Sequence, residues 1–167
     1  MSNFLEQGVL GIVTGILTTA ILFVVKAFWT SKVIPFLAKT RYQGVNVAGQ
    51  WSGSGKNEDP EKGDVFETEF SMFLEQTAHD LTGSFLFKFK NPNKDFSIDF
   101  DVKGYMWEGY LTINFVPKDK RITSYATALM KLHDGGISLV GTWLFRDVEK
   151  EFVNQCPLIL FRNTNGS

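Results

Sequence analysis

The residues best suited to bind a ligand are aromatic and basic side chains near the ends of predicted strands. Aromatic rings stack on the flat faces of nucleobases, and the arginine guanidinium pairs with phosphate through two hydrogen bonds. A nucleotide ligand would use such a mixture, although a solvated loop is the plainer interpretation of each residue taken singly. Within the 167 residues we expect ligand contacts at six positions: Tyr105, Trp107, Tyr110, Arg121, Tyr125 and Arg146.

Catalytic chemistry has few candidates in this sequence. The motifs H-E-x-x-H, G-x-S-x-G, G-x-G-x-x-G and the Walker phosphate loop do not occur. The two histidines, His79 and His133, each precede an aspartate at a predicted turn, where a histidine is usually solvated. The single cysteine, Cys156, excludes an internal disulfide and a cysteine-built zinc site. We therefore predict a binding protein with no catalytic residue, no metal and no cofactor.

An apolar segment near the N-terminus is the first element of the chain. Gln7 to Val25 are nineteen consecutive residues without a charge, and as a helix they would be roughly 28 Å long, close to the hydrocarbon thickness of a bilayer. A helix buried in a soluble core would normally show a polar stripe. A cleaved signal peptide would begin with basic residues and end in a small-residue cleavage site. We therefore predict a retained transmembrane helix.

Basic residues predict how this helix is oriented. None precedes the apolar segment, and four follow it: Lys26, Lys32, Lys39 and Arg41. Basic residues beside a span stay in the cytoplasm, so we expect a single-pass protein of the bacterial inner membrane with its N-terminus in the periplasm. The helix should continue past Val25 and kink or stop near Pro35. Residues 33–38 are too short to span by themselves, and whether they belong to a second membrane segment stays open.

Small residues share one side of the predicted helix: Gly8, Gly11, Gly15 and Thr19. Gly11 and Gly15 have the four-residue spacing that allows two helix backbones to approach closely. Glycine is also common in membrane helices generally, so chance is the plainer explanation. We expect this face to be the contact of a homo-oligomer whose subunit number the sequence does not define.

After Arg41 the hydrophobic pattern changes to a period of two, which is typical of half-buried strands. Consecutive strands on short connections favour an antiparallel meander, and eight such strands close into a barrel. A two-sheet sandwich would need a long crossover. We predict an all-β fold, an eight-stranded antiparallel up-and-down (lipocalin-like) barrel in residues 42–167, after a transmembrane helix and basic connector in residues 1–41. The expected strands lie near 48–55, 64–76, 80–90, 95–105, 108–116, 122–132, 136–147 and 156–163.

Glycine and tryptophan recur at one spacing in this predicted barrel. Gly49-x-Trp51 in the first strand is similar to the motif of lipocalin-like barrels, in which a tryptophan closes one end. Gly141-x-Trp143 repeats the spacing in the seventh strand. We interpret Gly53-x-Gly55 as a bulge or a turn, because it follows a strand without opening a helix.

Charge separates the two parts of the chain. Residues 1–41 carry four basic and one acidic side chain, a net charge of +3, and residues 42–167 carry thirteen basic and seventeen acidic, a net charge of −4. An acidic domain is repelled by bulk nucleic acid, so we expect no DNA or RNA partner. An anionic ligand would have to be held by a few local cations.

The arrangement as a whole resembles a known family. An N-terminal membrane helix, a basic connector and the stretch Tyr42-x-Gly44-Val45-x-Val47-x-Gly49-x-Trp51-x-Gly53 are similar to the membrane-anchored β-barrel effectors of bacterial cyclic-oligonucleotide anti-phage signalling (CBASS). The resemblance implies a cytosolic barrel that binds a cyclic dinucleotide made by a partner nucleotidyltransferase. Binding would promote assembly of the helices, disruption of the inner membrane and abortive infection.

Two other functions fit the same sequence. A lipocalin-like membrane-anchored barrel could hold an apolar small molecule, such as a lipid chain, among its inward-facing phenylalanines: Phe66, Phe70, Phe85, Phe87, Phe89, Phe96 and Phe100. A barrel filled by its own side chains could instead serve as a purely structural anchor.

Overall fold

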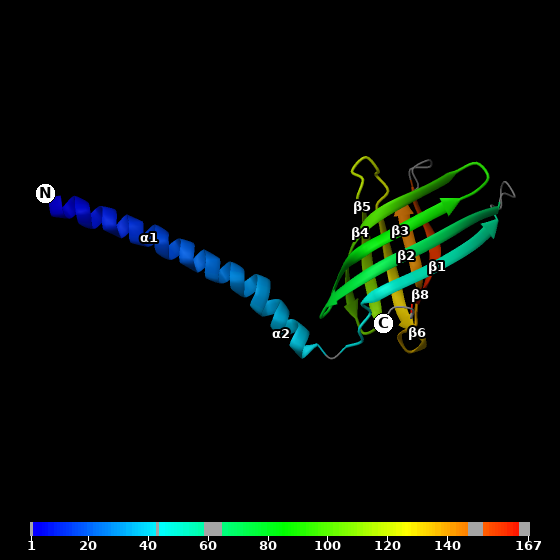
Figure 1. The fold of residues 1–167 in the computed structure, drawn as a ribbon, viewed down its shortest axis with the longest axis horizontal. Helices are drawn as coiled ribbons and strands as arrows, with labels where there is room; N and C mark the ends of the chain where they lie inside the picture. The colour runs from blue at the N-terminus through cyan, green and yellow to red at the C-terminus, as the bar shows by residue number, and fades with distance from the viewer. Residues whose placement is uncertain (1, 43, 59–64, 147–151, 164–167) are drawn as a thin grey trace. The chain divides into compact units, whose positions relative to one another are not determined.

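The computed structural model describes residues 2–42, 44–58, 65–146 and 152–163. The chain forms two compact units, Met1–Tyr42 and Gln43–Ser167. The first unit is helical and the second is built from strands (Figure 1).

The helical unit continues through Pro35. It consists of α1 (Ser2–Phe28), a π-helical turn η1 (Trp29–Val33) and α2 (Ile34–Arg41). A proline inside a regular α-helix removes one hydrogen bond and its ring collides with the carbonyl four residues earlier. The wider π-turn lies immediately before Pro35, and there the N–H of Ile34 donates to the carbonyl of Trp29, five residues back. Of the two predicted outcomes, a kink or a stop near Pro35, the stop does not occur: the helix is irregular at the π-turn, and residues 33–38 belong to this same helix.

The helix is long and apolar enough to cross a membrane. Its apolar part runs from Leu10 to Leu37, 28 residues whose most apolar window has a mean hydropathy of 2.1 and no buried residue. Threonine hydroxyls within it donate to carbonyls one turn back, for example Thr18 to Thr14 at 2.8 Å. These polar groups are therefore satisfied inside the helix, as a membrane requires.

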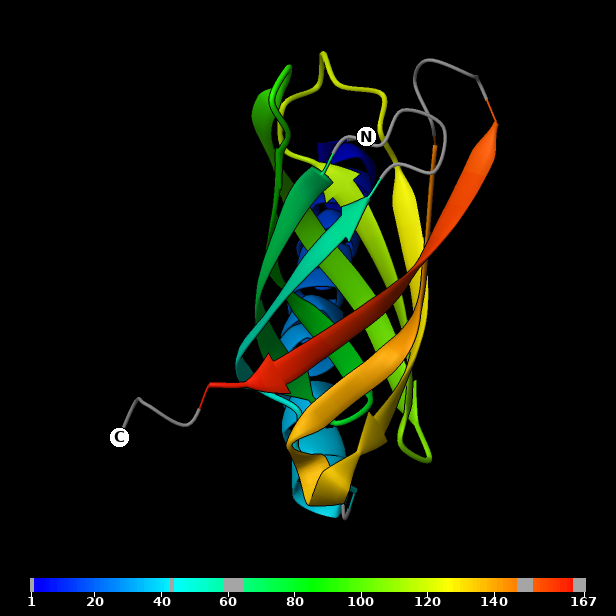
Figure 2. The same cartoon turned by 90° about the vertical axis from the view of Figure 1, so that its right-hand side faces the viewer.

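The second unit is a closed antiparallel barrel in which each strand pairs with the next and β8 returns to β1 (Figures 1 and 2). This confirms the predicted fold. Residues 64 and 147, where two predicted strands begin and end, lie outside the described residues. The strands are β1 (Gly49–Glu58), β2 (Val65–Thr77), β3 (Asp80–Lys90), β4 (Asp95–Trp107), β5 (Tyr110–Pro117), β6 (Ala126–His133), β7 (Ser138–Arg146) and β8 (Val153–Arg162).

Inward-facing side chains fill much of the barrel. Alternate residues along β5 are buried, as in Leu111, Ile113 and Phe115. The ring of Phe85 lies 4.7 Å from that of Phe115 and 6.0 Å from that of Phe100, measured between ring centroids. The largest fully buried side chains of the described residues are Trp51, Phe85, Phe100, Phe115, Met72 and Leu74.

Gly53 lies inside β1 and not at a turn, so the prediction of a bulge or turn there is wrong. A Cβ atom at this position would collide with the carbonyl oxygen of Ile159 on β8. The described pairing of β1 with β8 is limited to Trp51 with Arg162 and Ser52 with Phe161. The glycine is needed because the two strands approach closely beside this short junction.

Candidate functional site

The two ends of the barrel are built differently. The turns after β2, β4 and β6 lie at one end, together with the segment that leads into β1; we name this the sealed end. The connections after β1, β3, β5 and β7 lie at the other, which we name the aromatic end. Figure 2 shows the aromatic end at the top of the barrel.

The sealed end is closed by residues that precede β1. Val47 is completely buried, and its backbone N–H donates a hydrogen bond to the side-chain oxygen of Gln76 at 2.7 Å. The indole Nε1 of Trp51, which is also completely buried, donates to the carbonyl of Val47 at 2.9 Å. The tryptophan of the first G-x-W motif therefore closes this end, as its similarity to lipocalin-like barrels predicted.

Arg162 completes the closure, a role that the sequence analysis did not assign to it. Its guanidinium lies 4.8 Å from the ring of Trp51, and its Nη2 donates to the carbonyl of Asn46 at 2.7 Å. The signal was available in the alternation of β8, because Arg162 has the same parity as the buried Leu158 and Leu160. This arginine holds the sealed end together through a cation–π contact.

Three of the six predicted ligand contacts lie on the outside of the barrel at the sealed end. Tyr105, Trp107 and Tyr110 are all exposed, and 55% of the Trp107 surface is accessible. The ring of His79 lies 4.8 Å from Trp107 and 5.5 Å from Tyr105. Lys131 Nζ lies 5.3 Å above the ring of Tyr110. These contacts form an outer aromatic surface around the turn after β4.

The other three predicted contacts lie at the aromatic end. Arg121 is in the loop after β5, and its Nε and Nη2 donate to the carboxylate of Asp119 at 3.0 and 2.8 Å. This contact lowers the pKa of Asp119 and raises the pKa of Arg121. The backbone of Arg146 donates to the carbonyl of Tyr125 at 3.2 Å, and both side chains are exposed. All three residues therefore lie at the same end of the barrel.

The six predicted residues do not form one site. Tyr110 and Pro117 are the two ends of β5, and seven steps of a strand are about 23 Å long. Arg121 follows Pro117, whereas Trp107 precedes Tyr110. One small ligand therefore cannot contact both groups, and the role of either group in binding remains a prediction.

An aromatic cluster lies inside the barrel at the aromatic end. The rings of Phe66 and Phe89 are stacked 5.5 Å apart, and those of Phe89 and Phe96 are stacked 5.3 Å apart. Phe96 is 41% exposed, so solvent reaches this part of the cluster. The aromatic cluster comprises Phe66, Phe87, Phe89, Phe96 and Phe145, with Trp143 beneath them.

Trp143 is the most deeply buried member of this group. Phe87 lies 5.1 Å and Phe145 lies 4.9 Å from its ring. Its surface is only 4% exposed, and its Nε1 has no hydrogen-bond partner among the described atoms. Leaving a buried donor unpaired costs about 1–3 kcal/mol. Packing into the core accounts for the burial of this side chain but not for its unpaired donor.

Cys156 lies opposite Trp143 in the pairing of β7 with β8. Its side chain packs against the core at the edge of the same half of the barrel. Burial raises the pKa of the Cys156 thiol, so the thiol stays protonated at neutral pH. As the only cysteine of the chain, it is a natural reporter of this region.

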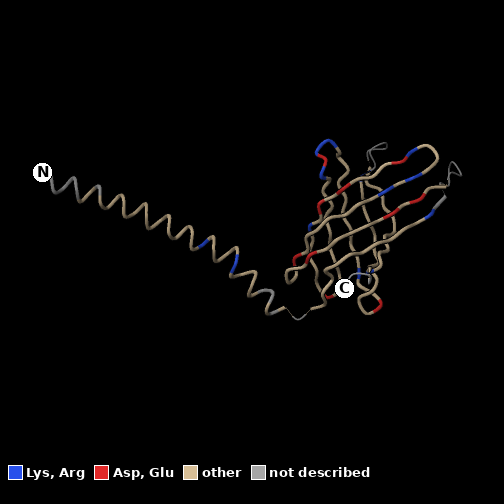
Figure 3. The backbone as a smooth tube through the Cα atoms, in the orientation of Figure 1, with Lys and Arg blue, Asp and Glu red and all other residues tan. Residues whose placement is uncertain are grey.

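Basic and acidic residues are interspersed along the strands and loops of the aromatic end (Figure 3). Some are paired, as in Lys56 with Glu67 at 3.0 Å and Lys88 with Glu69 at 3.1 Å. Exposed pairs of this kind contribute little to stability and can exchange partners readily. The exposed basic residues of this end include Lys88, Lys90, Lys118, Lys120, Arg121 and Arg146.

The fold and site together define an eight-stranded barrel preceded by one apolar helix, with an aromatic cluster at one end. Comparison of the chain with protein-family models, curated proteins and solved structures finds no match. Among the described residues, His, Cys, Asp and Glu form no group of three that could hold a metal ion.

Proposed function

We propose that the protein is a membrane-anchored receptor that binds a cyclic dinucleotide at the aromatic end of its barrel and acts as a CBASS anti-phage effector. The observation that carries this proposal is the combination of accessible phenylalanine rings with surrounding cations at one end, while the other end is sealed. The resemblance in membrane helix, connector and G-x-W stretch supports the same function. The ligand would come from a partner nucleotidyltransferase.

The chemistry of the aromatic end suits the two parts of a nucleotide. Bases stack on aromatic rings with about 1–3 kcal/mol each, and the exposed ring of Phe96 supplies such a face. Phosphates would be held by the exposed cations, among them Arg121 and Arg146. Asp119 engages Nε and Nη2 of Arg121, and thereby orients the guanidinium for a further anionic partner.

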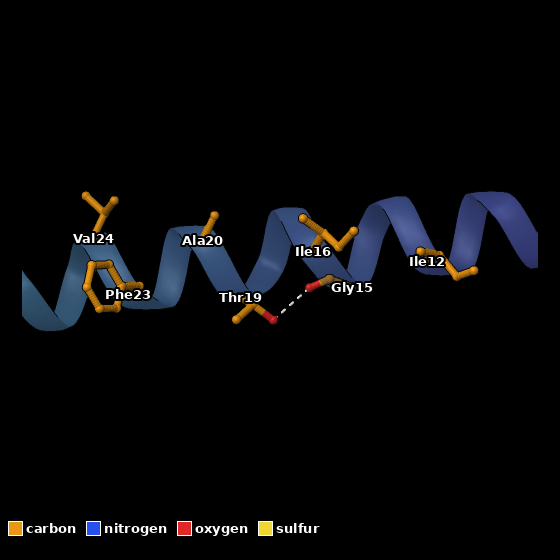
Figure 4. A pocket seen from close by; sticks show the side chains of 7 residues that line it. All are labelled: Ile12, Gly15, Ile16, Thr19, Ala20, Phe23 and Val24. Atoms are coloured by element: carbon orange, nitrogen blue, oxygen red, sulfur yellow. Dashed lines mark hydrogen bonds between the residues drawn. The ribbon is translucent and has the colours of Figure 1, made fainter.

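The helix would turn ligand binding into a membrane response. An open groove on α1 is lined by apolar and small side chains, and a Cβ atom added at Gly8, Gly11 or Gly15 would meet nothing within 4 Å. Gly15 and Thr19 of the predicted packing face line this groove, whereas Gly8 and Gly11 do not, and we propose that a second helix packs against the part that the face and the groove share. A ligand that binds the assembled state more tightly would shift the chain toward it. Figure 4 shows the groove residues Ile12, Gly15, Ile16, Thr19, Ala20, Phe23 and Val24.

The proposed topology places the N-terminus in the periplasm and the barrel in the cytoplasm, at the bacterial inner membrane. Lys26 and Lys32 support this orientation, because basic residues near a span stay in the cytoplasm. A cysteine-reactive reagent that does not cross the membrane tests it, with Cys156 replaced by Ser and a new cysteine placed at exposed Ser71. Labelling of intact spheroplasts would contradict the orientation, and labelling only after lysis would support it.

Substitutions in the helix test the assembly step. Gly11→Leu and Gly15→Leu should leave ligand binding intact and abolish toxicity, because the larger side chain keeps the backbones apart. Ile21→Leu, at a position of α1 that faces away from both the glycines and the groove, is the matched control and should kill cells as the parent does. If both glycine variants kill as efficiently as the parent, the packing face is wrong.

Titration of the full chain in detergent with cyclic di-AMP, cyclic di-GMP and cyclic GMP–AMP tests the receptor function. Binding should weaken as salt rises, because charged contacts are screened. Arg121→Ala and Arg146→Ala should each weaken it about tenfold, the effect of losing one charge-assisted hydrogen bond. Lys131→Ala, at the sealed end, should leave it unchanged. No binding of any of the three probes would reject this ligand class.

A second candidate is an apolar ligand, which one observation favours. The described side chains that form the aromatic cluster are all uncharged, and the neighbouring Ile98 and Cys156 are apolar as well. A fatty acyl chain would gain about 25 cal/mol for each Å² of apolar surface buried. Palmitate is the probe for this function, and its binding should be insensitive to Arg146→Ala.

A further inference from the structure

Two buried tryptophans of the chain differ in the hydrogen bonding of their indole Nε1. Nε1 of Trp51 donates to the carbonyl of Val47 at 2.9 Å. Nε1 of Trp143 is equally buried and has no partner among the described atoms. Buried donors in folded proteins are nearly always paired, so an unpaired one calls for an explanation. The two residues share the same G-x-W spacing, which makes Trp51 an internal reference for Trp143.

The aromatic side chains that contact Trp143 are phenylalanine rings, which offer its Nε1 no oxygen or nitrogen acceptor. Its indole contacts phenylalanine rings with centroid distances between 4.9 and 6.3 Å. On the inner side these rings are fixed by the packed core, as Phe85 and Phe115 are almost completely buried. On the outer side Phe87 and Phe145 are only partly buried. The route by which an acceptor can reach the indole therefore leads from the aromatic end, past these two rings.

We propose that Trp143 Nε1 donates a hydrogen bond to a nucleobase that inserts into the aromatic cluster, with Phe87 and Phe145 rotating to admit its edge. This inference rests on the proposed cyclic dinucleotide ligand and names the part of it that enters the barrel. A base fits because it is planar, stacks on phenylalanine and carries neutral acceptors, either a carbonyl oxygen or a ring nitrogen.

A charged group fits this position poorly. Phosphate or carboxylate buried beside one neutral donor would lose its hydration without gaining a counter-charge. The described cations of this end, such as Lys88 and Arg146, are exposed on the outer surface. The phosphates therefore stay outside with these cations while one base occupies the interior.

Replacing Trp143 by Phe tests the inference, because Phe keeps an aromatic ring and removes the N–H. In full-length protein in detergent, the affinity for the cyclic dinucleotide bound best by the parent should fall about 3- to 10-fold. The midpoint of unfolding without ligand should fall less than in the matched control Trp51→Phe, which removes a satisfied hydrogen bond. Trp51→Phe should bind ligand with the parent's affinity.

A spectroscopic measurement keeps the test independent of how the variant folds. The four tryptophans give four indole N–H signals in a ¹⁵N correlation spectrum, and that of Trp143 should move downfield when the dinucleotide is added. A parent that binds the dinucleotide with no shift of this signal, or a Trp143→Phe variant with unchanged affinity, would overturn the inference and leave the proposed function intact. A parent that binds none of the three dinucleotides would instead reject the proposed function, and the inference with it.

Discussion

Phe85 and Phe96 face the same barrel interior but should contribute very differently to its stability. Phe85 is 1% exposed and packs against four aromatic rings, those of Phe70, Phe100, Phe115 and Trp143. Truncation of such a side chain to Ala leaves a cavity and typically costs about 3–5 kcal/mol. Phe96 is 41% exposed, so roughly three fifths of the burial energy of a phenylalanine is at stake, about 1–2 kcal/mol.

Guanidinium denaturation of the full chain in detergent, followed by near-ultraviolet circular dichroism, measures this difference. Phe85→Ala should lower the free energy of unfolding by at least about 1 kcal/mol more than Phe96→Ala, because about 1 kcal/mol separates the lower end of the first range from the upper end of the second. Phe96→Ala should in turn weaken dinucleotide binding, whereas a core variant that remains folded should not. If the two variants lose equal stability, Phe96 is part of the structural core. The aromatic end would then offer no exposed ring for a ligand, and the proposed binding site would be rejected.

Three further predictions concern the barrel. Gly141→Ala should cost about 1–3 kcal/mol, because a Cβ there would collide with the carbonyl of Leu129; the exposed neighbour Thr142→Ala should change unfolding by less than about 0.5 kcal/mol. The rate at which iodoacetamide alkylates Cys156 should reach half its maximum at a higher pH in the folded protein than in the denatured protein, because burial raises the pKa of the thiol. An identical pH profile in both states would contradict that burial. Gln76→Ala should lower the free energy of unfolding by about 1–3 kcal/mol and expose Trp51 to fluorescence quenchers, because it removes the oxygen that accepts from the Val47 N–H. Unchanged quenching would show that the sealed end stays closed without Gln76.

The fold was predictable because each strand has one buried and one exposed face. Period-two alternation therefore identified the strands, but their ends depend on turns. The sixth strand was predicted to begin at residue 122, whereas β6 begins at Ala126. Asp119 holds the intervening loop through its carbonyl, which accepts from Ile122, and through its carboxylate, which accepts from Arg121. Side-chain bonds of this kind leave no periodic signal in the sequence.

The division of the predicted site was predictable in principle. In an up-and-down barrel successive turns alternate between the two ends, so Trp107 beside the fourth turn and Arg121 in the fifth connection cannot meet. The inward position of Arg162 follows from the parity of β8 in the same way. The unpaired donor of Trp143 was not predictable, because it depends on how neighbouring rings pack in three dimensions.

The π-turn before Pro35 has a consequence for any contact made along the helix. A turn with one extra residue rotates everything that follows by about 100° relative to a continuous α-helix. A stripe of side chains that faces a neighbour along α1 therefore points elsewhere in α2. In two copies held together through α1, the contacting side of the helix would therefore not continue beyond Trp29. Deletion of one residue within Trp29–Val33 would place the side chains of α1 and α2 on the same side of the helix again.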